Sequence, residues 1–196
     1  LGPGNHVGDP ANAPRDPSVG PGPYLFTIST IEPRKNLGTL FAAFAALKRK
    51  DVRLVVAGGK GWLYESALAR IGELGIADRV DLLGYVADDR LPGLYGHAEA
   101  YVCPSLTEGF GMPVLEAMLA GTPVVSSDAG ALPEVGGNLV RYFLPTDAEG
   151  MARAIDDELA DEGRRSRAAK AKLRAAEFTW DRCADLTLDA IEEAIR

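Results

Sequence analysis

The chain has 196 residues, of which 46% are hydrophobic and 25% charged, and its net charge is −7. These values fit an average soluble protein of one domain, or one domain plus a tail, that builds its core without metals or disulfides. The acidic balance argues against nonspecific nucleic-acid binding, which needs a basic surface.

The first 23 residues differ from the rest of the chain. Five of them are glycine and six are proline, a composition that does not hold a regular helix or strand. We expect residues 1–23 to form a partly extended interdomain linker and residues 24–196 to form the folded domain. A disordered tail is the alternative interpretation of the same segment.

From Tyr24 onward, short apolar runs alternate with helical patterns. Strands are predicted at 24–29, 53–57, 80–83, 100–103, 124–126 and 139–143, and helices at 37–49, 63–74, 88–96, 113–120, 132–135, 147–159, 163–178 and 180–196. Nearly continuous apolar strands that alternate with helices indicate a parallel sheet covered on both faces. Because such crossovers are right-handed, the predicted fold is an α/β doubly wound parallel sheet of Rossmann-like type. Ligands bind such sheets beyond the carboxyl ends of the strands.

The chain is organised around residues 104–118, where a predicted buried strand runs through a glycine-bearing turn into a helix. Pro113 suits a first helical position, because its φ is already helical and its missing N–H would be unpaired there. The helix N-terminus favours an anion such as phosphate. Gly109 and Gly111 allow the backbone to come close to a ligand, since no Cβ intervenes.

Two carboxylates, Glu108 and Glu116, flank this turn. Backbone N–H groups for a phosphate, combined with carboxylates for sugar hydroxyls, suggest a nucleotide-sugar pocket. An ordinary strand–turn–helix crossover with two solvated glutamates is the alternative on this stretch alone.

Basic residues follow two other predicted strands. Arg34 and Lys35 stand where two adjacent cations can clamp a diphosphate, and Lys60 lies in a glycine loop. A surface Arg–Lys pair is the common alternative. The glycine loop is not a Walker loop, because Lys60 is followed by Gly61. No G-x-G-x-x-G follows the first strand, which argues against a dinucleotide-binding domain.

Cys103 and Cys183 stand far apart and outside any Cys/His cluster. We therefore expect neither a zinc site nor a disulfide, and a reducing, cytoplasmic compartment. No apolar run reaches about 18 residues, so no transmembrane helix is expected, and the N-terminus lacks the regions of a signal peptide.

Taken together, the strand-end loops resemble the C-terminal, donor-binding domain of group 1 (family 4) glycosyltransferases of the GT-B fold. The resemblance covers Tyr24 to about Trp180. It rests on the segments IEPRKNL (31–37), GKGW (59–62), LGYV (83–86), PSLTEGFGMPVLEAM (104–118), GTPVV (121–125) and LPEVG (132–136).

In this family a C-terminal domain binds the nucleotide sugar and an N-terminal domain binds the acceptor. The resemblance implies three catalytic residues: Arg34 and Lys35 stabilise the leaving diphosphate, and Glu108 holds the sugar hydroxyls. Glu116 would accept hydrogen bonds from the ribose, away from the scissile bond, so the two glutamates are not the pair of a glycosidase. The remaining donor-binding positions implied are Lys60, Tyr85, Val86, Gly109, Phe110, Gly111, Met112 and Val114.

The resemblance also implies retention of anomeric configuration and no metal or other cofactor, since arginine and lysine replace the metal's charge. Residues 31–36 and the GKGW loop favour a mannosyltransferase-like branch that uses GDP-mannose. The implied partners are the nucleotide sugar, an absent N-terminal acceptor domain, and an unknown acceptor glycan or lipid-linked sugar in polysaccharide synthesis. Relatives often act at the cytoplasmic face of the inner membrane, through the other domain.

Two other functions stay open at this point. One is a module that binds nucleotide sugar without transfer, because we expect the 196-residue chain alone to be inactive. The other is a GT-B-fold sugar-nucleotide epimerase, against which the GFGMP pattern (109–113) argues. One departure concerns Ser29, where relatives commonly have glycine beside the phosphate. We also expect an exposed apolar patch near residues 180–196, since the last helix typically packs toward the partner domain.

Overall fold

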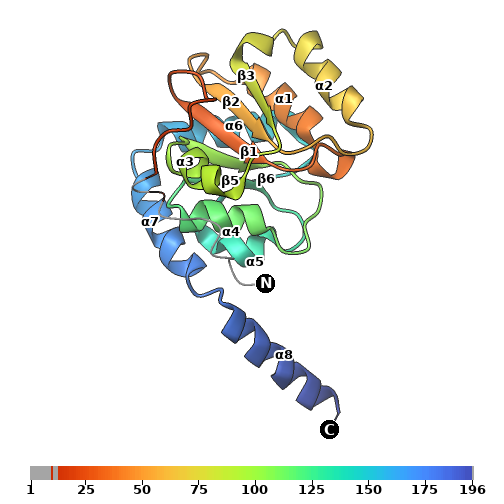
Figure 1. Ribbon diagram of the computed structural model, residues 1–196, viewed down its shortest axis with the longest axis vertical. Coiled ribbons are helices and arrows are strands. Elements are labelled where there is room, and N and C mark those ends of the chain that lie inside the picture. Colours follow the sequence, from red (N-terminus) through yellow and green to blue (C-terminus); the bar gives the residue numbers. More distant parts are fainter. Residues whose placement is uncertain (1–9, 11–12, 196) are drawn as a thin grey trace.

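A computed structural model describes residue 10 and residues 13–195. Its centre is a six-stranded, all-parallel sheet with the strand order β3-β2-β1-β4-β5-β6 (Figure 1). The strands are β1 (Tyr24–Ile28), β2 (Arg53–Ala57), β3 (Val80–Gly84), β4 (Ala100–Cys103), β5 (Val124–Ser127) and β6 (Arg141–Phe143). This order confirms the predicted doubly wound parallel sheet.

Helices follow the strands in the predicted alternation. The α-helices are α1 (Leu37–Ala46), α2 (Tyr64–Glu73), α3 (Leu91–Gly96), α4 (Met112–Leu119), α5 (Leu132–Gly136), α6 (Ala148–Ala160), α7 (Arg164–Ala175) and α8 (Trp180–Ala194). Four short 3₁₀ turns are η1 (Pro33–Lys35), η2 (Ala77–Arg79), η3 (Asp88–Arg90) and η4 (Gly137–Leu139). Each predicted helix is present, with bounds that shift by a few residues.

The largest shifts have local causes. Helix α1 ends at Ala46, three residues before the predicted end, because Leu47 turns to an extended conformation and buries its side chain. Strand β6 begins at Arg141, because η4 occupies the preceding residues. Helix α4 begins at Met112, so that Pro113 lies in its first turn but is not its first residue.

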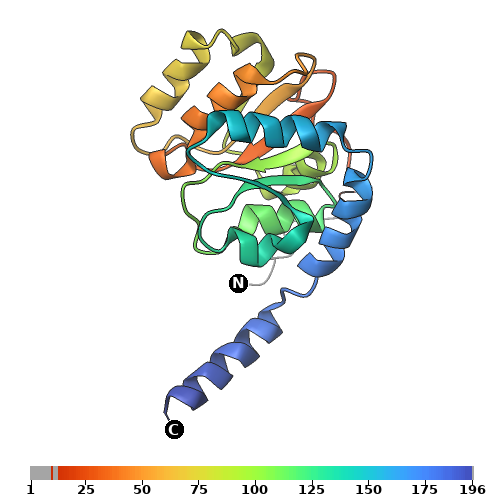
Figure 2. The ribbon, with the colours of Figure 1, turned by 180° about the vertical axis from the view of Figure 1, so that it is seen from behind.

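The core has two layers, one on each face of the sheet. Helices α1, α2 and α6 cover one face of the sheet, and α3, α4, α5 and α7 cover the other (Figures 1 and 2). Side chains of each group form one core layer. Strands β1, β2, β4 and β5 are buried over nearly their whole length, which explains their continuous apolar patterns.

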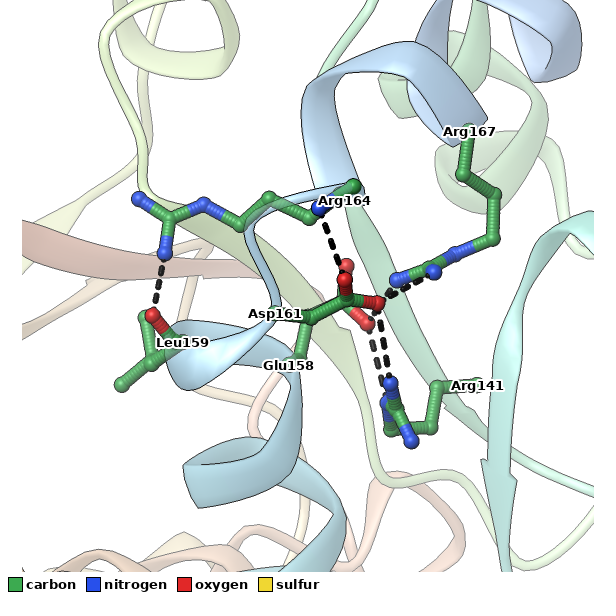
Figure 3. A network of polar contacts seen from close by, with 7 residues as sticks. Arg141, Glu158, Leu159, Asp161, Arg164 and Arg167 are labelled. Carbon is green, nitrogen blue, oxygen red and sulfur yellow. Dashed lines mark hydrogen bonds and ion pairs between the residues drawn. The ribbon is translucent and has the colours of Figure 1, made fainter.

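Helix α7 is fastened to the sheet layer by ion pairs. Glu158 of α6 is 1% exposed and binds Arg141 of β6 and Arg167 of α7 (Figure 3). Asp161 accepts from the same two arginines, at 3.3 and 2.6 Å. This network joins α6, α7 and the start of β6.

The described part of the N-terminal segment packs on the domain. Val19 joins the core, and the buried carboxylate of Asp16 accepts hydrogen bonds from Nε and from one terminal nitrogen, Nη2, of Arg90, at 2.7 Å each. Residues 13–23 contain no helix or strand, as predicted. They pack as a strap over η3 and α3, with Asp16 on Arg90 and Pro14 against Gly93.

Helix α8 projects away from the rest of the molecule (Figures 1 and 2). Five large apolar side chains are exposed along it: Trp180, Leu186, Leu188, Ile191 and Ile195. This confirms the predicted apolar patch near the last helix. Within the described residues, no helix is both long and apolar enough to cross a membrane.

Candidate functional site

The site lies where the strand order reverses, between β1 and β4. Strand β1 pairs with β2 on one side and with β4 on the other, both through Leu25. Helix α1, which follows β1, and helix α4, which follows β4, pack on opposite faces of the sheet. The loops that follow the two central strands meet there. Such a switch point is where doubly wound sheets bind ligands.

Asn36 and Arg34 join these two loops. Asn36 adopts a left-handed conformation with φ 55°, and its Nδ2 donates to the carbonyl oxygens of Pro104 at 2.9 Å and Pro145 at 2.8 Å. The N–H of Leu106 donates to the Arg34 carbonyl at 2.9 Å. The β1–α1 and β4–α4 loops are therefore held in a fixed relation.

Glu108 is the centre of the polar cluster. Its Oε1 accepts from Lys35 Nζ at 2.6 Å and from Ser105 Oγ at 2.7 Å, and its Oε2 accepts from Arg34 at 3.1 Å. The Glu108 and Lys35 side chains are 11% and 14% exposed, whereas that of Arg34 is 42% exposed. Arg34 also pairs with Glu32 at 3.0 Å. The predicted catalytic trio thus forms one ion-pair cluster with an open side at Arg34.

These contacts keep Glu108 charged. Burial acts to raise the pKa of Glu108, but hydrogen bonds from Lys35 and Ser105 and the charges of Lys35 and Arg34 outweigh it, so the pKa lies below its usual value. Burial acts to lower the pKa of Arg34, yet Glu108 and Glu32 raise it. A carboxylate and a guanidinium, both ionised, therefore face the ligand edge.

A third loop supports Glu108 from behind. The N–H of Ala131 donates to the Glu108 carbonyl at 3.1 Å, and Ser127 Oγ donates to the Ser105 carbonyl at 2.7 Å. Gly130 has φ +60°, and a Cβ there would lie 2.3 Å from the Glu108 carbonyl oxygen. Only glycine suits this conformation and this close approach.

Gly111 has a similar double requirement at the start of α4. Its φ is 91°, and a Cβ would lie 2.5 Å from Leu132 of α5. Gly109, by contrast, is exposed, and a Cβ there would meet nothing within 4 Å. The space beside Gly109 is therefore open to a ligand, while Gly111 serves the packing of α4 on α5. Met112 lies in the first turn and is half-buried, and Val114 is fully buried.

Glu116 lies in the second turn of α4 and is half-buried. Its Oε2 accepts a hydrogen bond of 2.8 Å from the hydroxyl of Tyr95, which belongs to α3 and is fully buried. The two carboxylates thus have different surroundings, since Glu108 faces two cations and Glu116 faces a phenol.

The other predicted donor-binding side chains lie around these two centres. Lys60 is exposed and its Nζ sits 4.9 Å from the ring centre of Tyr64, so no described contact brings it into the Glu108 cluster. Tyr85 is 80% exposed after β3, whereas its neighbour Val86 is 5% exposed and belongs to the core. The ring of Phe110 packs edge-on against Phe178, with 5.9 Å between ring centres.

Comparison with known proteins identifies the family of the chain. The model of the family "Glycosyl transferases group 1" matches residues 11–174. This chain is a group 1 glycosyltransferase domain. Its sheet is the Rossmann-like half of a GT-B fold, as the motifs predicted.

Several relatives of this glycosyltransferase are mannosyltransferases. O-antigen chain mannosyltransferase B of Escherichia coli is 38% identical over 172 residues, which are 85% of this chain and 45% of that protein. D-inositol 3-phosphate glycosyltransferase of Salinispora tropica is 37% identical over 188 residues, covering 86% of this chain and 38% of that protein. The chain thus spans less than half the length of these relatives.

Solved structures show the same fold. Sucrose-phosphate synthase from Thermosynechococcus elongatus superposes with a TM-score of 0.77 at 26% identity, over the whole of this chain and 50% of the synthase. HepE of Anabaena, solved with UDP and glucose, also gives 0.77 at 24% identity, over 87% of this chain and 48% of that chain.

Three supporting residues of this glycosyltransferase escaped the sequence reasoning. Ser105 and Gly130 complete the Glu108 cluster, and Tyr95 holds Glu116. Gly130 carried a signal, since a glycine after Asp128-Ala129 at a strand end is typical of a left-handed turn. Tyr95 carried none, because its distance from Glu116 depends on how α3 packs on α4. Among the described residues, no group of three or more histidine, cysteine or acidic side chains has the geometry to hold a metal ion.

Proposed function

We propose that this chain is the donor-binding half of a retaining glycosyltransferase that transfers a hexose from a nucleotide-diphosphate sugar to an acceptor glycan or lipid-linked sugar in polysaccharide synthesis. The observation that carries the proposal is the cluster of Arg34, Lys35 and Glu108 at the switch point of the sheet. We propose that an acceptor-binding domain of the full-length protein closes over this edge, at the cytoplasmic face of the inner membrane.

The two cations are suited to a leaving diphosphate. Arg34 offers a planar fork that fits two phosphate oxygens, and Lys35 adds a compact charge. As the bond between sugar and phosphate breaks, negative charge accumulates on the diphosphate, and fixed cations then gain interaction energy. Each charged hydrogen bond contributes about 1.5–3 kcal/mol. Two such groups supply the charge that a metal ion would otherwise provide.

The two glutamates serve different ends of the donor in this proposal. Glu108 stays ionised and, with the open backbone at Gly109, accepts hydrogen bonds from sugar hydroxyls. Glu116 lies in the second turn of α4 and accepts hydrogen bonds from the ribose hydroxyls. Tyr85, exposed beyond β3, flanks the base, and Lys60 adds positive charge at the rim.

Ser29 gives this proposal a specific test at the end of β1. Its Oγ is buried and, within the described part of the chain, has no hydrogen-bond partner. An unpaired buried hydroxyl costs about 1–3 kcal/mol, and a phosphate oxygen of the donor would satisfy it. If the Ser29 hydroxyl binds a phosphate oxygen, Ser29→Ala is expected to weaken binding of the diphosphate. If the side chain only narrows the approach of the phosphate, Ser29→Ala is expected to strengthen binding of the donor.

Mannose is the favoured sugar and GDP-mannose the favoured donor. Support comes from the IEPRKN and GKGW segments and from the relatives, which include mannosyltransferases of two bacterial genera. HepE, which was solved with UDP and glucose, supports a uridine donor in the same fold at lower identity. The match to a transferase family disfavours the epimerase alternative.

Calorimetric titration of the chain with GDP-mannose, UDP-glucose, UDP-N-acetylglucosamine and ADP-glucose, in the presence of a chelator, tests the proposal. We expect one donor to bind, and Arg34→Ala and Glu116→Ala each to weaken it at least tenfold. Arg70→Ala is the matched control, because Arg70 pairs with Glu73 on the surface of α2, and no described contact joins it to the Glu108 cluster. Equal binding by the wild-type chain and all three variants, or binding only after a divalent metal is added, would contradict the proposed site.

A further inference from the structure

Tyr95 is a buried phenol whose hydroxyl is directed at a carboxylate on the ligand edge. The side chain is 0% exposed, and the hydroxyl donates to Glu116 Oε2 at 2.8 Å. Burial raises the pKa of Tyr95 well above 10, with Tyr101 and Glu116 adding to the effect. The phenol is therefore protonated, and a hydrogen-bond donor, at neutral pH.

The backbone that carries Tyr95 is held in place from three sides. Helix α3 has six residues and contains Pro92, Gly93 and Gly96, so it has little helical stability of its own. The hydroxyl of Tyr24 donates to the Leu94 carbonyl at 2.8 Å, and Thr122 Oγ1 donates to the Tyr95 carbonyl at 2.7 Å. These bonds tie α3 to β1 and to the end of α4.

The strap of residues 13–23 closes the third side. A Cβ on Gly93 would lie 2.3 Å from the Pro14 carbonyl oxygen, so the backbones of α3 and the strap are in close contact there. The ring of Tyr95 also packs edge-on against Phe26, with 5.0 Å between centres, and lies 5.6 Å from the ring of Tyr101. The phenol oxygen is thus fixed by the fold before any ligand arrives.

We propose that Tyr95 is a positioning residue that sets the orientation of the Glu116 carboxylate for the hydroxyls of a ribose. The inference rests on the proposed function, in which Glu116 binds the nucleoside. A glutamate has three side-chain torsions, and ordering them on binding weakens affinity. A fixed donor to Oε2 orders the carboxylate in advance, and that oxygen can still accept a second bond.

The test uses variants of the whole chain and probes that differ only at the ribose. Tyr95→Phe removes one oxygen atom, and Tyr101→Phe is the matched control, because Tyr101 is equally buried in the same cluster and its hydroxyl interacts with the backbone of Ile28. Binding of GDP and UDP is compared with that of their 2′,3′-dideoxy analogues. We expect Tyr95→Phe to weaken the ribonucleotide about 5- to 20-fold and to leave the dideoxy analogue unchanged, and Tyr101→Phe to change neither.

A double-mutant cycle locates the effect. In a Glu116→Gln background, Tyr95→Phe is expected to cost less than twofold, because the carboxylate it orients is gone. Three results would overturn the positioning role while leaving the proposed function intact. Tyr95→Phe could weaken binding of the ribonucleotide and of the dideoxy analogue equally, weaken binding equally with Glu116 and with Gln at position 116, or leave binding unchanged. Failure of the wild-type chain to bind any of the nucleotides would overturn both.

A second measurement needs no variant. A buried, hydrogen-bonded phenol proton exchanges slowly enough to be observed by NMR, and we expect the Tyr95 hydroxyl resonance to shift when GDP or UDP binds and to stay unchanged with the dideoxy analogue. The same shift of the Tyr95 hydroxyl resonance with the ribonucleotide and with its dideoxy analogue would refute the inference.

Discussion

Replacing Lys35 by methionine tests the ion-pair cluster directly. Methionine keeps most of the apolar stem and removes the ammonium group that lies 2.6 Å from Glu108 Oε1. Both side chains are mostly buried, at 14% and 11% exposure, so solvent screens the pair little. Breaking a buried pair costs about 3–5 kcal/mol when the remaining charge has no partner. Here Ser105 and Arg34 still bind Glu108, so we expect a smaller loss of about 2 kcal/mol at pH 7.

The pH dependence gives this prediction its sign. The pKa of Glu108 is depressed in the folded chain, so its ionisation stabilises the fold above the unfolded pKa of about 4.3, and that stability is lost as pH falls through the folded pKa. Lys35→Met raises the folded pKa of Glu108. The stability difference between wild type and variant should therefore be constant near neutral pH, begin to narrow at the variant's higher pKa, and disappear below the wild-type pKa.

Urea unfolding from pH 7 to pH 3.5 measures this difference. Lys50→Met is the matched control, because Lys50 is exposed and its ammonium group donates to the Ala45 carbonyl rather than to a carboxylate. It should lower stability by less than about 0.5 kcal/mol at every pH. A loss in Lys35→Met that does not change between pH 7 and pH 3.5 would show that packing of the stem, and not the charge on Glu108, explains the effect.

Three further predictions concern the surroundings of the site. Gly130→Ala places a Cβ 2.3 Å from a carbonyl oxygen of the β4–α4 loop and should lower the free energy of thermal unfolding by at least about 2 kcal/mol. Gly75 has a similar φ but open space around it, so Gly75→Ala should lower the free energy of unfolding by about 1 kcal/mol. Glu158→Gln should lower the free energy of unfolding in urea by about 2–4 kcal/mol, whereas Asp157→Asn, at an exposed position, should leave it almost unchanged. Equal losses in the two variants would contradict the network of Figure 3. Asp16→Asn should lose about 1–2 kcal/mol at pH 7 and expose the strap to proteolysis; because the Arg90 hydrogen bond lowers the pKa of Asp16 to about 2, the loss should fade as pH drops from about 4 toward 2.

The sheet and the order of its elements were predictable because their signal is local. Runs such as Leu54–Ala57 are apolar at every position, and a parallel strand buried on both faces requires this pattern. The handedness of the crossovers then leaves few arrangements of six parallel strands. The placement of Arg34, Lys35 and Glu108 at one edge was predictable for the same reason, since all three follow central strands and the carboxyl ends of parallel strands share one edge. The ion pairs between them were not predicted.

The support behind the site was not predictable from local patterns. Tyr95 reaches Glu116 across 21 positions of sequence, and Asn36 bonds to Pro145 across 109 positions. Whether such atoms meet depends on packing distances of a few tenths of an ångström, which composition and periodicity do not encode. The packing of residues 13–23 on the domain was not predictable for another reason. Glycine and proline content predicts the absence of helix and strand, but it does not predict that Asp16 binds Arg90.

The pairing of Glu108 with both cations has a consequence for the proposed catalysis. In the structure Arg34 and Lys35 are already partly neutralised by Glu108 and Glu32, so a bound diphosphate in the ground state must share them. The attraction for the phosphate grows as the sugar bond breaks and charge accumulates on the leaving group, while the attraction for the carboxylates stays constant. An interaction that strengthens only toward the transition state raises the rate rather than the ground-state affinity. This arrangement of charges therefore favours a site with weaker donor binding but faster transfer. Glu32→Gln removes one competing charge from Arg34 and is expected to strengthen binding of the donor in the ground state more than it stabilises the transition state.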